Sequence, residues 1–273
     1  MSGMNIGANT FSYIYKSGFL NCLKKLRLMG YREFEIIVTQ PHFWVTDIST
    51  NDRRDIPKIL ADEGLHIASV NIPGIDNNIV SGTREMRKFT IEILTDLVDI
   101  CSDWNIPYCI FVPGRTMPLF PIPKDQLTEW FIEGMTVIAQ HACNRGVKML
   151  IENVPNTWIP KARDMMEAIN AVGRHDIGVV YDVANASFAG ENITDGIKIV
   201  KDRLELIHLS DTEIKKWRHD PIGMGDIVFE EIRKVLIEIE FSGISMLEII
   251  TDNPDFYFVE SHEKLVEMGW NNF

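Results

Sequence analysis

Cysteine is scarce in this sequence, and its spacing argues against two classes of small, cross-linked fold. Only four of the 273 residues are cysteines, and no two of them form a C-x-x-C pair. A zinc knot or a disulfide scaffold needs closely spaced, paired cysteines. We therefore expect all four to be small apolar side chains of the core, namely Cys22, Cys101, Cys109 and Cys143.

Long apolar runs are also missing, although 45% of the residues are hydrophobic. No run approaches the roughly 20 residues that a helix needs to cross a bilayer. The N-terminal segment MSGMNIGANTFS has neither the basic nor the apolar region of an export signal. We expect a soluble, cytoplasmic protein without a membrane partner.

The chain has no excess of positive charge. Its formal net charge is −12. A negative charge of this size opposes attraction to the phosphate backbones of nucleic acids. We expect no nucleic acid as a partner, and the sequence leaves a homo-oligomer open.

Eight short apolar runs rich in β-branched or aromatic residues punctuate the chain. Their average spacing is roughly 34 residues, which is the size of one strand-helix unit. A unit of this kind, repeated eight times, is typical of a parallel barrel. The runs lie near residues 4–9, 33–38, 66–72, 107–112, 147–152, 177–182, 204–209 and 244–250.

The segments between these runs have helical periodicity, at 20–29, 83–100, 127–143, 165–172 and 227–239. Glycines follow four of them, and we expect these to provide left-handed helix caps: Gly30, Gly146, Gly173 and Gly243. The glycine-rich turn G-x-G-x-x-G of an open, doubly wound sheet is absent. The sequence therefore predicts an α/β fold, a single (β/α)₈ TIM barrel that spans residues 1–273 as one domain.

Four polar residues stand at the ends of the last four predicted strands, namely Glu152, Asp182, His208 and Glu248. Each is separated from the next by enough chain for one strand, one helix and two loops. In a parallel barrel, successive strand ends converge on one face. We expect the four side chains to lie around a common point.

Three carboxylates and one imidazole at a common point predict a metal site. Without a cation, the acidic groups would repel one another and would resist burial. Three oxygen donors and one nitrogen donor suit a hard or borderline divalent ion. We predict one divalent metal, with Mn²⁺ as the first choice and Co²⁺, Mg²⁺ or Zn²⁺ as alternatives.

Several segments of this chain resemble the xylose isomerase-like barrel superfamily of sugar (phosphate) isomerases, epimerases and inosose dehydratases. They are MNIGANTFS, IENVPN, VVYDVANA, IHLSD, RHDPIGMGDIVF and LEI, and their order and spacing carry the resemblance. It implies that Glu152, Asp182, His208 and Glu248 are metal ligands and that Glu152 and Glu248 are also the catalytic acid/base pair. It also implies that residues 218–225 form a loop that closes on substrate, with His219 in contact.

The chain departs from the family pattern at two places. Many members carry D-x-x-H after the sixth strand, whereas this chain has Asn185, which can bind a hydroxyl but cannot titrate. The apurinic endonuclease branch, with its three-zinc cluster, uses histidines where this chain has Asn71 and Val112. Trp217 stands where that branch has an aspartate. These differences argue against a three-metal phosphodiesterase.

Isomerisation and epimerisation of a ketose both begin with removal of a proton beside a carbonyl. A cation that bridges the carbonyl and a hydroxyl stabilises the developing enediolate, and a nearby carboxylate accepts the proton. We predict an enzyme, a metal-dependent isomerase or epimerase of a ketose or related sugar, free or phosphorylated. An inosose-type dehydratase, a hydrolase of the apurinic endonuclease type and a catalytically silent sugar-binding barrel remain as alternatives.

Further residues are candidates for the pocket. We predict substrate contacts from Arg115, Asn185, Asp211, Arg218 and His219, although Asp211 could instead orient a ligand. Glu35 and Arg115 could bind hydroxyls or an anionic group, or form ion pairs across the barrel mouth. The loop residues His42, Phe43 and Trp44 are candidates for the pocket wall or for loop packing, and Lys215 and Lys216 for phosphate recognition or a solvated loop.

Overall fold

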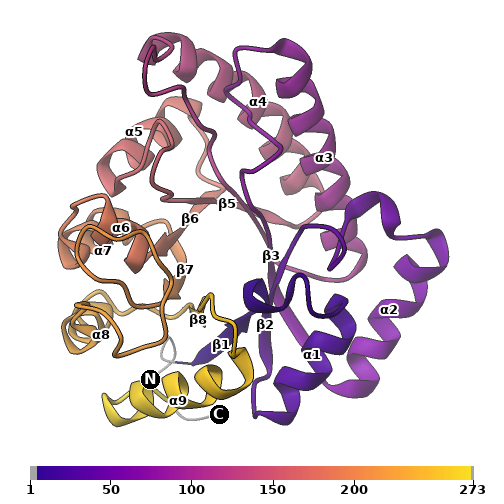
Figure 1. Cartoon of the computed structure of the whole chain (residues 1–273). Helices are drawn as coiled ribbons and strands as arrows, with labels where there is room; N and C mark the ends of the chain where they lie inside the picture. Colours follow the sequence, from indigo (N-terminus) through magenta and orange to yellow (C-terminus); the bar gives the residue numbers. More distant parts are fainter. Residues whose placement is uncertain (1–4, 272–273) are drawn as a thin grey trace.

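Eight parallel strands close into a barrel in the computed structural model, which describes residues 5–271 (Figure 1). Each strand pairs with the next along the chain, and β8 pairs with β1. This confirms the predicted (β/α)₈ TIM barrel. The strands are β1 (Ile6–Asn9), β2 (Glu33–Ile37), β3 (His66–Ile72), β4 (Tyr108–Phe111), β5 (Lys148–Glu152), β6 (Ile177–Asp182), β7 (Leu204–Leu209) and β8 (Ile244–Leu247).

Every predicted apolar run contains one of these strands, although residue 4 of the first run lies outside the described residues. Helices connect the strands and surround the barrel (Figure 1). In the described part of the chain, none of them is long and apolar enough to span a membrane. They are α1 (Phe19–Leu28), α2 (Thr50–Glu63), α3 (Arg84–Asp103), α4 (Lys124–Asn144), α5 (Ala162–Val172), α6 (Val183–Phe188), α7 (Ile193–Val200), α8 (Phe229–Glu238) and α9 (Pro254–Glu267), with short 3₁₀ turns η1 (Phe11–Tyr13) and η2 (Val45–Asp47).

The alternation of side chains along the strands separates an apolar layer from a polar layer inside the barrel. Ile110, Leu150, Val180 and Leu206 form a small buried apolar cluster. The residues two positions further along β5, β6 and β7 are the polar Glu152, Asp182 and His208. Because side chains repeat their direction every second residue of a strand, these polar groups point inward above the apolar layer.

The intervening residues point outward and pack against the helices. Tyr181 and Ile207 on the strands are fully buried in the main core cluster, together with helix residues such as Leu94 and Leu97 of α3. The prediction for the cysteines is right for Cys22, Cys101 and Cys109, which are buried. It is wrong for Cys143, which is exposed in the last turn of α4.

Three of the four glycines after the predicted helices have positive φ: Gly30, Gly146 and Gly173. The prediction for Gly243 is wrong. The left-handed residue after α8 is Glu240, with φ of 56°. A Cβ at Gly243 would collide with the backbone oxygen of Glu205 on β7 and with the ring of Phe241, so this position needs glycine for close packing.

Gly243→Ala should therefore destabilise the barrel, because the added methyl group has no space between the helix-to-strand turn and β7. Overpacking of this kind typically costs about 1–3 kcal/mol. Gly82→Ala is the matched control, since a Cβ there would make only an ordinary contact with Ile122 at 3.6 Å. Thermal unfolding should show a lower Tm for Gly243→Ala than for Gly82→Ala, and equal values would contradict this packing argument.

Candidate metal centre and active site

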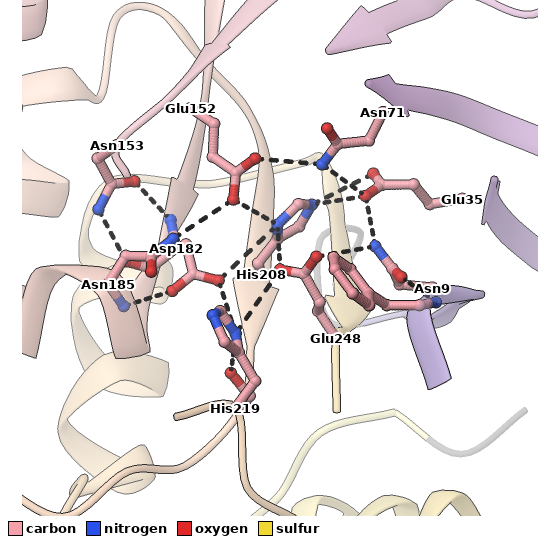
Figure 2. A network of polar contacts seen from close by, with 12 residues as sticks. Asn9, Glu35, Asn71, Glu152, Asn153, Asp182, Asn185, His208, His219 and Glu248 are labelled. Carbon is pink, nitrogen blue, oxygen red and sulfur yellow. Dashed lines mark hydrogen bonds and ion pairs between the residues drawn. The ribbon is translucent and has the colours of Figure 1, made fainter. Parts of the chain in front are cut away.

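The four predicted ligands converge inside one end of the barrel (Figure 2). Glu152, Asp182 and His208 come from the ends of β5, β6 and β7, and Glu248 follows β8 directly. All four are buried, and one donor atom from each lies within 4.8 Å of the donor atoms of the others. This group could hold a divalent metal ion.

The imidazole of His208 points its Nδ1 atom at the three carboxylates. Nδ1 lies 2.9 Å from Glu248 Oε2, 3.5 Å from Glu152 Oε1 and 3.9 Å from Asp182 Oδ2. Nδ1, Glu248 Oε2 and Asp182 Oδ2 are buried without a hydrogen bond of normal geometry. Unsatisfied atoms of this kind are rare in protein interiors, and their convergence fits a bound cation.

The two carboxylate oxygens of Asp182 have different roles, since one caps a helix and the other faces the candidate metal centre. Oδ1 accepts a 2.6 Å hydrogen bond from the backbone N–H of Asn185 and so caps α6. The backbone of Asp182 is fixed by the side chain of Asn153, which accepts from its N–H at 2.7 Å and donates to its C=O at 2.9 Å. Oδ2 is left to face the other candidate ligands.

Glu152 and Glu248 are held in the same manner by asparagine side chains from distant strands (Figure 2). Asn71 at the end of β3 donates to Glu152 Oε2 at 3.1 Å, and Asn9 at the end of β1 donates to Glu248 Oε1 at 3.2 Å. Each carboxylate therefore has one oxygen fixed by an amide and a second oxygen directed toward His208.

Burial makes the charged forms of these carboxylates unfavourable. It raises the pKa of Asp182 and that of Glu248 to about 7, and the nearby charge of Glu152 contributes, while His208 opposes the shift. Burial lowers the pKa of His208, but the charges of Glu35 and Glu248 outweigh it and raise that pKa well above its usual value. A cation would replace the protons that these groups otherwise retain.

Glu35 on β2 holds the other side of the imidazole. His208 Nε2 lies 3.1 Å from Glu35 Oε1 and 3.2 Å from Oε2. Ser69 donates to Glu35 at 2.6 Å, as do Asn9 at 2.6 Å and Asn71 at 3.3 Å. Burial opposes the ionisation of Glu35, but His208 and the donors Ser69 and Asn71 outweigh it and lower its pKa.

The consequence for metal binding is a defined tautomer of His208. The ionised carboxylate accepts a hydrogen bond from Nε2–H, so a cation that displaces the Nδ1 proton would find the Nδ1 lone pair available. Of the two roles considered for Glu35, the structure shows the ion pair. Glu35 does not line the cavity above the centre.

A cavity of about 410 Å³ opens above the four candidate ligands. Glu152 and Glu248 line it, whereas Asp182 and His208 are not among its lining residues and are both fully buried. The predicted substrate contacts Arg115, Asn185, Arg218 and His219 line it as well. Its other walls are largely apolar and include Phe11, Ile37, Ile75, Val112, Val154, Trp217 and Ile250.

His219 and Arg218 reach the cavity from the loop between β7 and α8. His219 Nδ1 lies 3.0 Å from Ser210 Oγ, 3.6 Å from Asp182 Oδ2 and 3.8 Å from Glu248 Oε2. The exposed guanidinium of Arg218 pairs with Asp220 at 2.9 Å. Both residues can therefore meet a molecule bound above the carboxylates.

Asp211 does not line the cavity. Its buried carboxylate accepts hydrogen bonds from the backbone N–H groups of Thr212, Gly223 and Ile227 at 2.9–3.2 Å. These contacts favour a role in folding the loop.

Other candidates also lie outside the cavity lining. His42, Phe43 and Trp44 are not among the lining residues, and Phe43 packs against Phe19 and Trp104. Loop packing is thus the interpretation that fits this segment. Lys215 and Lys216 do not line the cavity, and Lys216 pairs with Glu213.

Sequence reasoning overlooked the roles of Asn9, Ser69, Asn71 and Trp217. Asn9 and Asn71 lie at or next to strand ends, so the rule that selected the ligands would also have selected them. No local pattern indicated Trp217, whose indole lines the cavity from the β7–α8 loop.

The model of the protein family described as xylose isomerase-like TIM barrel matches residues 23–268 of this chain. The chain is 27% identical to an inosose isomerase of Halalkalibacterium halodurans over 64% of each protein. It is 19% identical to a fructoselysine 3-epimerase of Shigella flexneri, over 86% of this chain and 88% of that protein.

Solved structures with the same fold include the following two. A D-tagatose 3-epimerase-like protein superposes with a TM-score of 0.84 at 20% identity, covering 97% of this chain and 96% of its own. A protein described as IOLI with a bound zinc atom has a TM-score of 0.81 at 18% identity, covering 98% of this chain and 100% of its own.

Glu35→Gln should weaken metal binding without unfolding the barrel, because the neutral amide oxygen of glutamine is a weaker acceptor for His208 Nε2–H than a carboxylate. Loss of such a partner typically lowers metal affinity about 10–100-fold. Glu33→Gln is the matched control, since Glu33 lies on the same strand but pairs with the exposed His66. Calorimetric titration with Mn²⁺ should rank wild type and Glu33→Gln above Glu35→Gln, with His208→Ala weakest. Equal affinities would contradict the role of Glu35.

Stabilisation by metal should increase with pH. The raised pKa values mean that Asp182 and Glu248 hold protons below about pH 7, whereas the unfolded chain releases them near pH 4. The metal-free fold therefore loses stability as the pH rises between these values, and a cation that replaces the protons restores it. The rise in Tm on adding Mn²⁺ should be larger at about pH 8 than at about pH 6. An equal or smaller rise at the higher pH would count against a carboxylate-rich site.

Proposed function

We propose that this chain, which belongs to the xylose isomerase-like TIM barrel family, is a metal-dependent isomerase or epimerase of a ketose or related sugar. One observation carries the proposal. Of the four candidate ligands, Glu152 and Glu248 also face the cavity, and Asp182 and His208 lie buried beside them. Two carboxylates at one metal site, both open to substrate, are what proton removal and proton return require.

The metal in this proposal is a single divalent cation held by Glu152, Asp182, His208 and Glu248. The unsatisfied atoms at Asp182, His208 and Glu248 support this assignment. Three oxygens and one nitrogen favour Mn²⁺, with Co²⁺, Mg²⁺ and Zn²⁺ as alternatives. When bound, the cation would polarise the sugar carbonyl and the adjacent hydroxyl.

The chain's own carboxylates then move the proton. One of Glu152 and Glu248 removes a proton from the carbon beside the carbonyl, and the other returns a proton to the enediolate. Return to the opposite face gives an epimer, and return to the neighbouring carbon gives an isomer.

The remaining polar groups of the cavity would bind sugar hydroxyls. We assign this role to Asn185 and His219, which lie closest to the carboxylates, and to Arg218 and Arg115 at the cavity wall. Asp211 would act indirectly by shaping the loop that carries His219 and Arg218.

The relatives support this assignment by their names, which are those of sugar isomerases and epimerases. A dehydratase would use the same carboxylates and would differ by losing water from the enediolate. Incubation of Mn²⁺-loaded protein with a panel of ketoses and inososes in D₂O separates the outcomes. Deuterium in a recovered sugar supports an isomerase or epimerase, and a dehydrated product supports the dehydratase. In a separate incubation, cleavage of an abasic-site duplex would support a hydrolase.

Glu152→Gln and Glu248→Gln should each lose turnover while retaining metal. Glutamine keeps an oxygen for the cation but cannot transfer a proton, and loss of a positioned acid or base typically costs about 10²–10⁴ in rate. If the two residues serve different faces of the sugar, one variant should still exchange the substrate proton with D₂O but form no product.

Rates of product formation, deuterium exchange and metal content are to be measured in parallel. Glu230→Gln, an exposed position on α8, is the control for a change of charge alone. Full turnover in both cavity variants would exclude the proposed acid/base roles, even if metal were bound.

A further inference from the structure

We infer that Trp217 fixes the side-chain amide of Asn185, so that an N–H donor and not the carbonyl oxygen faces Glu152 and the substrate. This inference rests on the proposed function and deepens it, because it assigns the polarity of one substrate subsite. Trp217 acts through Asn185 and is thus a positioning residue. It also forms part of the cavity wall.

The contact joins the β7–α8 loop to α6. The indole Nε1–H of Trp217 donates to Asn185 Oδ1 at 2.8 Å. The Trp217 ring also stacks on Phe188, with 6.0 Å between centroids and 20° between planes. Asn185 and Phe188 both belong to α6, which begins directly after Asp182. The indole is thereby held at two points on the helix next to the candidate metal centre.

The chemistry of the indole determines which end of the amide faces Glu152. Indole N–H is a donor only, so its partner on Asn185 must be the carbonyl oxygen. The amide nitrogen then points the other way, where Nδ2 lies 3.5 Å from Glu152 Oε1. If the amide were flipped, its N–H₂ group would face the indole N–H of Trp217, and its oxygen would face a carboxylate oxygen of Glu152. Neither pair can form a hydrogen bond, so the flipped orientation is unfavourable at both ends.

The loop that carries Trp217 is itself fixed. Asp211 and Asp220 form an antiparallel bridge, with distances of 2.8 and 2.7 Å between the backbone nitrogen of each residue and the backbone oxygen of the other. The Asp211 carboxylate binds further backbone N–H groups, including that of Gly223. Trp217 lies between these anchored ends. Contacts within the protein therefore hold its ring in position before a substrate binds.

The consequence for recognition is specific. Asn185 lines the cavity beside Glu152 and presents only a donor there, so the substrate atom next to Glu152 must accept a hydrogen bond. A carbonyl or hydroxyl oxygen satisfies this requirement. The proposed substrate is therefore a sugar that carries an oxygen on the same carbon as the proton that Glu152 transfers. An analogue that lacks this oxygen should be rejected.

The first test does not depend on turnover. In ¹⁵N-labelled protein, the Trp217 indole N–H signal is identified by its absence in Trp217→Phe, a variant that keeps an aromatic ring for stacking on Phe188. Asn185→Ala should shift that signal, and Trp217→Phe should shift the Asn185 amide pair. Ile214→Ala, an exposed position in the same loop outside the cavity lining, should shift neither. Unchanged signals in both cavity variants would overturn the inference.

The second test uses the ketose that shows deuterium exchange with the wild-type protein. Trp217→Phe should lower kcat about tenfold, the effect of losing one hydrogen bond near the reacting group, with KM within about twofold. Trp217→Ala should also raise KM, because the wall is lost. The double variant Trp217→Phe/Asn185→Ala should be no slower than Asn185→Ala, since Trp217 acts through Asn185.

Additive losses in that double variant would mean that Trp217 only fills space, and would overturn the positioning role. The deoxy analogue gives an independent outcome. It should compete poorly with the ketose in wild type and relatively better in Asn185→Ala. If no sugar of the panel exchanges with D₂O, the proposed function fails, and the nuclear magnetic resonance comparison still decides the Trp217–Asn185 contact.

Discussion

The site depends on one buried imidazole that lies between opposing sets of carboxylates. His208 contacts Glu35 through Nε2 and faces Glu152, Asp182 and Glu248 through Nδ1. Four carboxylates in an apolar interior are costly unless positive charge and hydrogen bonds compensate. Without a metal, the protonated imidazole supplies this compensation, and a divalent cation would supply it when bound. The surrounding amides and hydroxyls fix the positions of the side chains in both cases.

The barrel itself explains why the functional groups divide into two classes. Side-chain alternation brings a polar layer above the apolar layer of Ile110, Leu150, Val180 and Leu206. Within that polar layer, some groups open into the cavity and others are enclosed by their neighbours. The enclosed groups can carry charge and fix the positions of neighbouring side chains, but they cannot contact a substrate. The open groups can take part in proton transfer and recognition.

The loops add specificity to this common base. Asp211 organises the β7–α8 loop through backbone N–H groups, and the loop then delivers Trp217, Arg218 and His219 to the cavity. The indole of Trp217 connects this loop to Asn185, and Asn185 reaches Glu152. Two successive contacts thus link a surface loop to a carboxylate that both faces the cavity and belongs to the candidate metal centre.

The sequence by itself determined the strands, five of the nine helices in the described part of the chain and the candidate ligands, because each depends on local periodicity or on the position of a residue at a strand end. Only the tertiary structure decided which distant groups meet. Asn9 and Glu248 are 239 residues apart in the chain yet share a hydrogen bond, and His208 and Glu35 are 173 apart. Gly243 likewise needs glycine because of β7 and not because of its own helix end. Such pairings arise when the barrel closes, and closure brings together side chains whose separation along the chain carries no periodic signal.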